Sequence, residues 1–204
     1  MFTDITPKYI VGSDPSFAHY GLTIIDRVNK TIQTFDIKST LGRQDFLNMY
    51  VKSKEQVQNV LDIIKSVDRD IITSLDTVYG MENALVHSFT ATALTALDMR
   101  LYETFSSKLT ATFNPTYLTF LMGKHKKSDS IALANKLLEI YNEHNYKHTK
   151  QASKSLTDGE AESLIYATRM LCRTAKDEKV VQHILEFEPK FKEEKEKYLE
   201  DFIY

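Results

Sequence analysis

Four carboxylate residues stand where the sequence predicts a strand or a helix to end or begin. Asp14 ends one apolar segment, Glu82 ends another, and Asp158 and Glu162 open a helical one. At about 100° per residue, Asp158 and Glu162 lie about 40° apart on one helix face. Carboxylates that meet at one edge repel each other and raise one pKa, and a bound divalent cation removes that cost. We therefore expect these four residues to be metal ligands, with Mg²⁺ as the cation that suits carboxylates and water.

Glu160 lies between two of these acids in sequence but on another helix face. It is about 160–200° from both Asp158 and Glu162, so it cannot join them without breaking the helix. Thr157 and Glu160 instead fit a capping box, in which the glutamate reaches back to the first backbone amide. The apolar stripe of this helix places Asp158 and Glu162 on its flank; its members are Ala161, Leu164, Ile165, Leu171 and Cys172, and we expect Cys172 to be a core residue.

Basic residues gather in two predicted loops, each just before a helix. Helix N-termini also attract phosphate through their backbone amides, so both groups are candidates for phosphate contact, with solvated loops as the alternative. The first group is Lys124, His125, Lys126 and Lys127, and the second is Lys147, His148, Lys150 and Lys154. His19, beside the turn after Asp14, is a third candidate with the same alternative. His144 and His148 are spaced as metal ligands, but no third ligand is apparent in the sequence.

The composition indicates a globular chain of one domain or at most two small ones. The chain has 204 residues, of which 42% are hydrophobic and 26% charged, with six Gly and four Pro. These values exclude collagen-like, low-complexity and wholly disordered classes. No apolar run approaches the roughly 18 residues of a membrane span, and the first residues show no secretory signal. A single cysteine favours the cytoplasm, and a net charge of −2 excludes a uniformly basic surface but not a local basic patch.

The predicted elements alternate after an early meander. Three strands with short connections open the chain, and strands then alternate with helices, which is unlike a doubly wound nucleotide fold. We predict an α/β fold with a mixed five-stranded sheet flanked by helices. The predicted strands are 8–15, 20–27, 31–38, 75–81 and 110–113, the helices are 43–67, 88–108, 127–144 and 158–175, and 146–156 is a loop. The charged segment 177–204 is predicted as a helical extension of the domain 1–176, with a partner-binding arm as the alternative.

Three motifs together resemble the RuvC-like Holliday-junction resolvases. Ile10-Val11-Gly12-Ser13-Asp14-Pro15-Ser16, followed by Gly21, is similar to the family's first two strands. Val78-Tyr79-Gly80-Met81-Glu82 looks like its fourth strand, and Asp158-Gly159-Glu160-Ala161-Glu162-Ser163-Leu164 looks like its last catalytic helix. The motifs occur in the family's order and cover about 8–172. The chain departs from the pattern in having Glu162 instead of Asp, Gly159 where some members have an acid, Ser16 instead of Gly, and a segment beyond about 176.

The resemblance implies an RNase H-like nuclease that acts as a homodimer on four-way DNA junctions and leaves 5′-phosphate and 3′-hydroxyl ends. It implies two Mg²⁺ ions, with Mn²⁺ as a substitute, held by Asp14, Glu82, Asp158 and Glu162; two such ions about 3.5–4 Å apart suit in-line hydrolysis. It implies a lysine near the scissile phosphate, for which Lys127 is the best match and Lys126 the next. A junction-opening wedge is expected shortly after Glu82, at Leu85 or Phe89, with Phe89 as a core residue in the alternative.

Helix 88–108 is predicted as the dimer contact. Its apolar residues occur almost all the way round, whereas a helix packed only on its own sheet has a polar outer face. The alternative is a monomer in which the C-terminal segment covers this helix. No membrane and no nucleotide cofactor are expected. The competing functions are a less selective nuclease on flaps, branched DNA or RNA–DNA hybrids, a non-catalytic DNA-binding module of the same fold, and a sugar-kinase-like ATPase, for which the chain is short.

Overall fold

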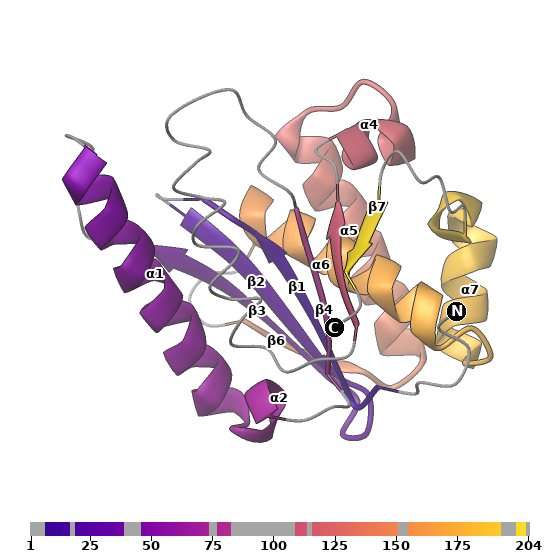
Figure 1. Cartoon of the computed structure of the whole chain (residues 1–204). Coiled ribbons are helices and arrows are strands. Elements are labelled where there is room, and N and C mark those ends of the chain that lie inside the picture. The colour runs from indigo at the N-terminus through magenta and orange to yellow at the C-terminus, as the bar shows by residue number, and fades with distance from the viewer. Residues whose placement is uncertain are drawn as a thin grey trace.

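One sheet with helices on both faces forms the core of the molecule (Figure 1). The computed structural model describes residues 7–16, 19–38, 46–73, 77–82, 109–113, 116–150, 155–192 and 199–202. The predicted helix 88–108 and the wedge candidates Leu85 and Phe89 lie outside these residues, as does Lys154. In the described part of the chain no helix is long and apolar enough to cross a membrane.

The sheet has the predicted mixed order, extended by one strand at each edge. β1 (Tyr9–Asp14), β2 (His19–Asp26) and β3 (Thr31–Lys38) form the antiparallel meander, and β4 (Thr77–Glu82) and β5 (Leu109–Phe113) follow parallel to β1. This arrangement confirms the RNase H-like fold class. The seven-stranded order is β6-β3-β2-β1-β4-β5-β7.

The two edge strands correct the expectation for their segments. β6 (Lys147–Lys150) pairs in parallel with β3 within the predicted loop 146–156, and β7 (Leu199–Phe202) pairs antiparallel with β5 in the segment predicted as helical. The four residues of β6 are all polar and lack the alternation of apolar and polar residues that predicts a strand. They form a strand because they pair with β3. The domain boundary after 176 stays a prediction.

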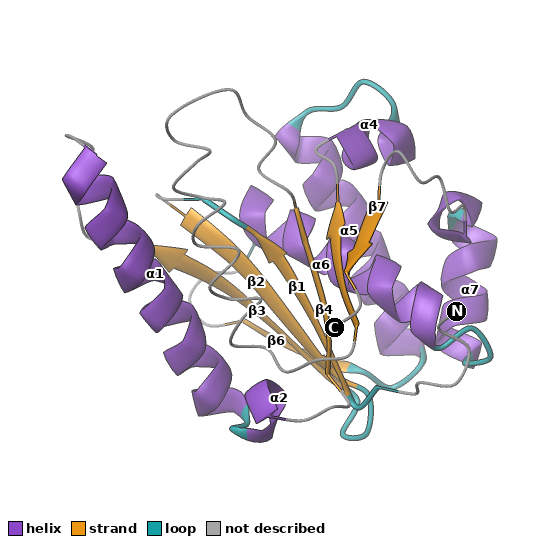
Figure 2. Ribbon diagram, viewed as in Figure 1, coloured by secondary structure: helices purple, strands orange, loops and turns teal. Residues whose placement is uncertain are grey.

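The helices form two layers, which Figure 2 shows in purple on either side of the strands. α1 (Phe46–Val67) covers one face, where Val11, Leu22 and Ile24 contribute to its core, and the short α2 (Asp70–Thr73) follows it. α6 (Asp158–Thr174) lies on the other face and contacts β1, β2 and β4. The remaining helices pack on this second side: α4 (Thr116–Met122), α5 (Lys127–Glu143), α7 (Lys179–Phe187) and the 3₁₀ turn η1 (Pro189–Lys192).

Two glycines let α6 rest directly on the backbone of the sheet. A Cβ at Gly12 would lie 2.2 Å from the carbonyl oxygen of Ser163, and one at Gly21 would lie 2.0 Å from that of Gly159. Any side chain at either position would therefore push the helix away. The close approach brings the start of α6, which carries Asp158 and Glu162, against the ends of β1 and β2. The predicted core position of Cys172 on this helix is confirmed, since it is buried.

Candidate active site

The parallel pairing of β1 and β4 brings two of the acids to one sheet edge, the edge at which these two strands end. Their register pairs Ser13 with Met81, so Asp14 and Glu82 are the next residues of two neighbouring strands. Asp14 is half-buried. For Glu82 the structure describes the backbone, and its side chain lies outside the described part. The expected convergence of these two positions is therefore present in the backbone.

The first two turns of α6 add the other two acids at the same edge. A Cβ at Gly159 would lie 3.4 Å from a carboxylate oxygen of Asp14, so the helix start and this carboxylate are in contact. The pKa of Glu162 is raised to about 7, first by burial and then by the negative charge of Asp14, with a smaller contribution from Asp158. Asp14, Asp158 and Glu162 therefore share one electrostatic environment, as the helix geometry predicts.

The first turn of α5 faces these acids with a lysine and a serine. Lys127 forms an ion pair with Asp158 and is otherwise exposed. This contact lowers the pKa of Asp158 and raises the pKa of Lys127. The negative charges of Glu162 and Asp14 raise the pKa of Lys127 further, by smaller amounts. Three residues after Lys127, the buried Ser130 hydroxyl donates to Glu162 Oε1 at 3.2 Å. Ser130 is not among the site residues predicted from the sequence. Only its position three residues after Lys127, on the same helix face, could have indicated that it belongs to the site.

The rest of the first basic group surrounds the start of α5. Gly123 takes a positive φ of 75° in the turn before the helix, and Lys124 and Lys126 are exposed. The Lys126 amide donates to the Asp129 carboxylate at 2.8 Å, which caps α5. His125 is close enough to Glu162 to lower its pKa slightly against the effect of burial. Lys127 and His125 therefore lie beside the acids, and Lys124 and Lys126 are their neighbours in sequence.

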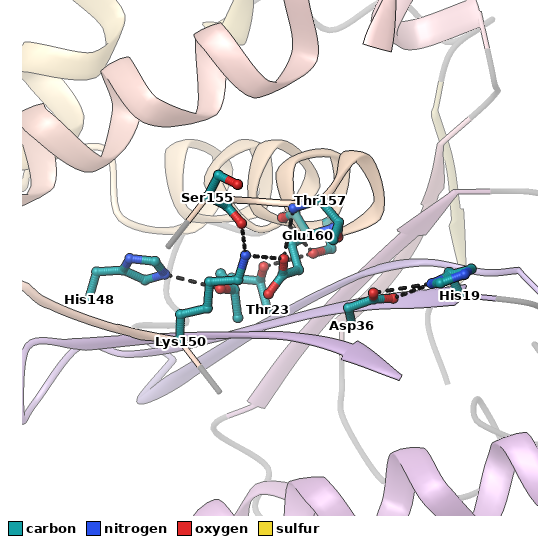
Figure 3. Close-up of polar contacts among 10 residues, drawn as sticks. His19, Thr23, Asp36, His148, Lys150, Ser155, Thr157 and Glu160 are labelled. Carbon is teal, nitrogen blue, oxygen red and sulfur yellow. Dashed lines mark hydrogen bonds and ion pairs between the residues drawn. The ribbon is translucent and has the colours of Figure 1, made fainter. Parts of the chain in front are cut away.

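Glu160 has the capping role that the sequence predicts, and it has a second partner. The Thr157 amide donates to Glu160 Oε2 at 2.8 Å, and the Glu160 amide donates to Thr157 Oγ1 at 3.3 Å. Lys150 Nζ lies 2.7 Å from the same carboxylate, in an ion pair whose side chains are 11% and 2% exposed. Lys150 also donates to the Ser155 carbonyl oxygen, as Figure 3 shows. The expectation that Lys150 contacts DNA does not fit this buried position, so we leave it out of the candidate interface.

Two other members of the second basic group, Lys147 and His148, lie on the edge strand β6. Lys147 is exposed, and His148 Nε2 lies 3.0 Å from Thr34 Oγ1, where partial burial lowers the pKa of the imidazole. His144 is hydrogen-bonded to His183 at 3.3 Å, in place of the pairing with His148 that the spacing suggested. Among the side chains that the structure describes, no three histidine, cysteine, aspartate or glutamate residues form a metal-binding group. The metal site proposed below therefore depends on Glu82.

Comparison with known proteins places the fold beside one group of solved structures. No protein-family model and no curated protein matches the sequence. Thermus thermophilus RuvC is 13% identical, with a TM-score of 0.47 over 83% of this chain and 97% of that one. The fold resembles RuvC. The T. thermophilus RuvC in complex with a Holliday junction substrate is 11% identical, with a TM-score of 0.47 over 83% of this chain and 96% of that one. The similarity is one of fold, and the site residues stay a prediction.

Proposed function

We propose that this chain is a metal-dependent endonuclease that resolves four-way DNA junctions by paired phosphodiester hydrolysis. The observation that supports the proposal is the gathering of Asp14, Asp158 and Glu162 at one sheet edge, next to the backbone of Glu82 and beside Lys127. Burial, and then the negative charge of Asp14, raise the pKa of Glu162 to about 7, and a bound cation would favour its ionised form.

The donor set fits divalent cations such as Mg²⁺, with Mn²⁺ as a substitute, because all four groups are carboxylates. Asp14, Glu82, Asp158 and Glu162 would hold the ions, and when bound these would supply an activated water and neutralise the leaving oxygen. Ser130 holds Glu162 in place through its hydroxyl. Lys127, which neutralises Asp158 in the absence of a metal, is the group we assign to the scissile phosphate.

The DNA path in this proposal follows the basic residues around the acids. Lys124, His125 and Lys126 lie at the start of α5 and would contact backbone phosphates. Lys147 pairs with Thr31, at the end of β3 away from the acids, and Lys154 is outside the described residues, so DNA contact by either stays a prediction. Leu85 or Phe89, after the strand that carries Glu82, would open the junction. A homodimer built on helix 88–108 would supply two symmetric cuts, because a two-fold substrate suits a two-fold enzyme. The proposed compartment is the cytoplasm, and no nucleotide cofactor is required.

The test is a nicking assay on a synthetic mobile four-way junction with and without Mg²⁺. We expect Mg²⁺-dependent paired nicks, and Asp14→Asn, Glu82→Gln, Asp158→Asn and Glu162→Gln should each reduce the rate at least about a hundredfold, which corresponds to about 2.7 kcal/mol. Junction binding should remain. Glu139→Gln is the matched control, because Glu139 is an exposed acid on α5 paired with Lys136.

Each competing function gives a different result in the same assay. Equal cleavage of a Y-shaped fork, a linear duplex and the junction would replace the proposal by a less selective nuclease. Tight junction binding without cleavage would replace it by a DNA-binding module. Near-normal cleavage by the Glu82→Gln protein would refute the four-carboxylate site itself.

A further inference from the structure

A histidine and an aspartate form a pair at the same sheet edge, outside the set of four acids. His19 begins β2 and Asp36 lies on the neighbouring β3. Nδ1 of His19 is 3.0 and 3.1 Å from the two carboxylate oxygens of Asp36, as Figure 3 shows. The contact fixes the orientation of the imidazole ring.

Strand register places this pair on the side of the sheet that carries Asp14. Gly21 pairs with Asp14 on one side and with Asp36 on the other. Gly21 faces α6, because a Cβ there would meet the backbone of Gly159. Residues two apart in a strand share a face, so His19 faces the same side. Its Cα lies one two-residue step, about 7 Å, beyond Gly21 along β2, at the solvent end of the acidic edge.

The pair has one buried and one open member. The Asp36 side chain is 15% exposed and the His19 side chain 56% exposed. The Asp36 carboxylate is hydrogen-bonded to Nδ1 of His19. Among the described residues no hydrogen-bond partner is found for His19 Nε2. An imidazole whose Nδ1 donates to a carboxylate can donate a second hydrogen bond from Nε2 when it is protonated. Such a donor, fixed in direction and open to solvent, suits an anionic oxygen.

We propose that His19, oriented by Asp36, binds a backbone phosphate of the DNA strand that lies across the acidic edge. This inference rests on the proposed function and names a positioning residue for it. Phosphate is the favoured ligand because a DNA strand approaching Asp14, Asp158 and Glu162 is itself anionic, and hydrogen-bond donors near the acids can bind it. Lys127 supplies one such donor from α5, and His19 supplies another from β2.

The experiment measures junction affinity against salt concentration at pH 6. Binding is measured on a Glu82→Gln background so that the junction stays intact, and cleavage is measured without that substitution. His19→Ala should weaken binding about fivefold to tenfold and reduce the slope of log affinity against log salt by about 0.9, the loss of one phosphate contact. KM should rise while kcat changes less than about twofold. His19→Lys should restore the slope, and Asp36→Asn should weaken binding about twofold to threefold.

His183→Ala is the matched control, because His183 also lies near a carboxylate, that of Glu143 at 3.6 Å, but belongs to α7. It should leave affinity and slope unchanged. A His19→Ala protein with a lower melting temperature but the wild-type salt slope would assign the pair to strand stability and overturn the inference. Wild-type cleavage with unchanged His19→Ala parameters would overturn this inference alone. A wild-type chain that neither binds nor cleaves a junction would overturn the proposed function together with it.

Discussion

Replacing Glu162 with glutamine should stabilise the metal-free protein at alkaline pH and leave its stability unchanged in acid. Burial and the charge of Asp14 raise the pKa of Glu162 to about 7, whereas an ordinary glutamate has a pKa of 4.5. Below about pH 4.5 the carboxyl is protonated in both the folded and the unfolded chain, so it does not change the free energy of unfolding. Between about pH 4.5 and pH 7 only the folded chain keeps the proton. Above about pH 7 the carboxyl is ionised in both states, and its full destabilisation of the folded state is present.

The size of this effect follows from the two pKa values. A pKa of about 7 in place of 4.5 corresponds to about 3 kcal/mol of destabilisation above pH 7. Glu162 is only half-buried, and solvent screens part of this energy, so we expect about 1–2 kcal/mol. For a chain of this length that is a rise in melting temperature of about 2–8 °C. Glutamine keeps the acceptor for the Ser130 hydroxyl, so that contact is not lost.

Thermal unfolding in EDTA from pH 4.5 to pH 9 measures the prediction. The difference between Glu162→Gln and wild type should be near zero at pH 4.5 and grow through pH 5–7 to its plateau. Glu139→Gln, which changes an exposed carboxylate, should give a flat difference over the whole range. If the Glu162→Gln difference is also flat, Glu162 titrates as an ordinary glutamate, and the crowding of acids on which the metal site is argued does not exist.

Four other substitutions or measurements test separate parts of the structure. Glu160→Gln should keep the capping box and cleavage but lose about 2–4 kcal/mol of stability, because it leaves Lys150 buried without its counter-ion; urea unfolding measures this, and the double variant with Lys150→Met should recover part of the loss. Gly21→Ala should prevent α6 from packing on β2, since its Cβ would overlap the Gly159 carbonyl. It should lower the melting temperature far more than Gly123→Ala, whose Cβ meets no atom within 4 Å and which costs only the backbone strain of its positive φ. Alanine at Lys124, Lys126 and Lys127 together should flatten the salt dependence of junction binding, and an unchanged slope would assign these lysines to solvent. Light scattering behind a sizing column at micromolar concentration should give twice 23.5 kDa for the dimer expected from helix 88–108, and a mass near 23.5 kDa would contradict it.

The sequence predicted those parts of the fold that have a periodic apolar pattern. The meander, the parallel strands after it and the helix with the Thr157–Glu160 capping box all follow from local spacing. The convergence of Asp14, Asp158 and Glu162 was also predictable, because each stands at an element end and helix geometry selects two of the three acids on α6. Glu82 is placed by the backbone alone, and the wedge and dimer predictions lie outside the described residues.

Contacts between distant segments could not be predicted in the same way. The segment at Lys150 is polar and has the composition of a surface loop, yet pairing with β3 turns Lys150 toward Glu160 and buries it. Ser130 has no unusual neighbours in sequence, and its role depends on how α5 lies against α6. His19 and Asp36 are 17 residues apart in sequence. They meet only because β2 pairs with β3 in a register that puts Gly21 opposite Asp36. In each case the missing information is a register or a helix packing that a single sequence does not contain.

The same small residues that allow the fold also limit the charge of the site. Gly21 must lack a side chain for α6 to approach β2, and that approach leaves position 159 next to the Asp14 carboxylate. An acid at 159 would start from a Cβ 3.4 Å from an oxygen of Asp14 and would add a further negative charge near Glu162, whose pKa is already raised to about 7. A glycine there avoids this repulsion. The carboxylate of Glu162, four residues after Asp158 on the same face of α6, accepts instead from Ser130 of α5, and this contact fixes its position beside Asp14.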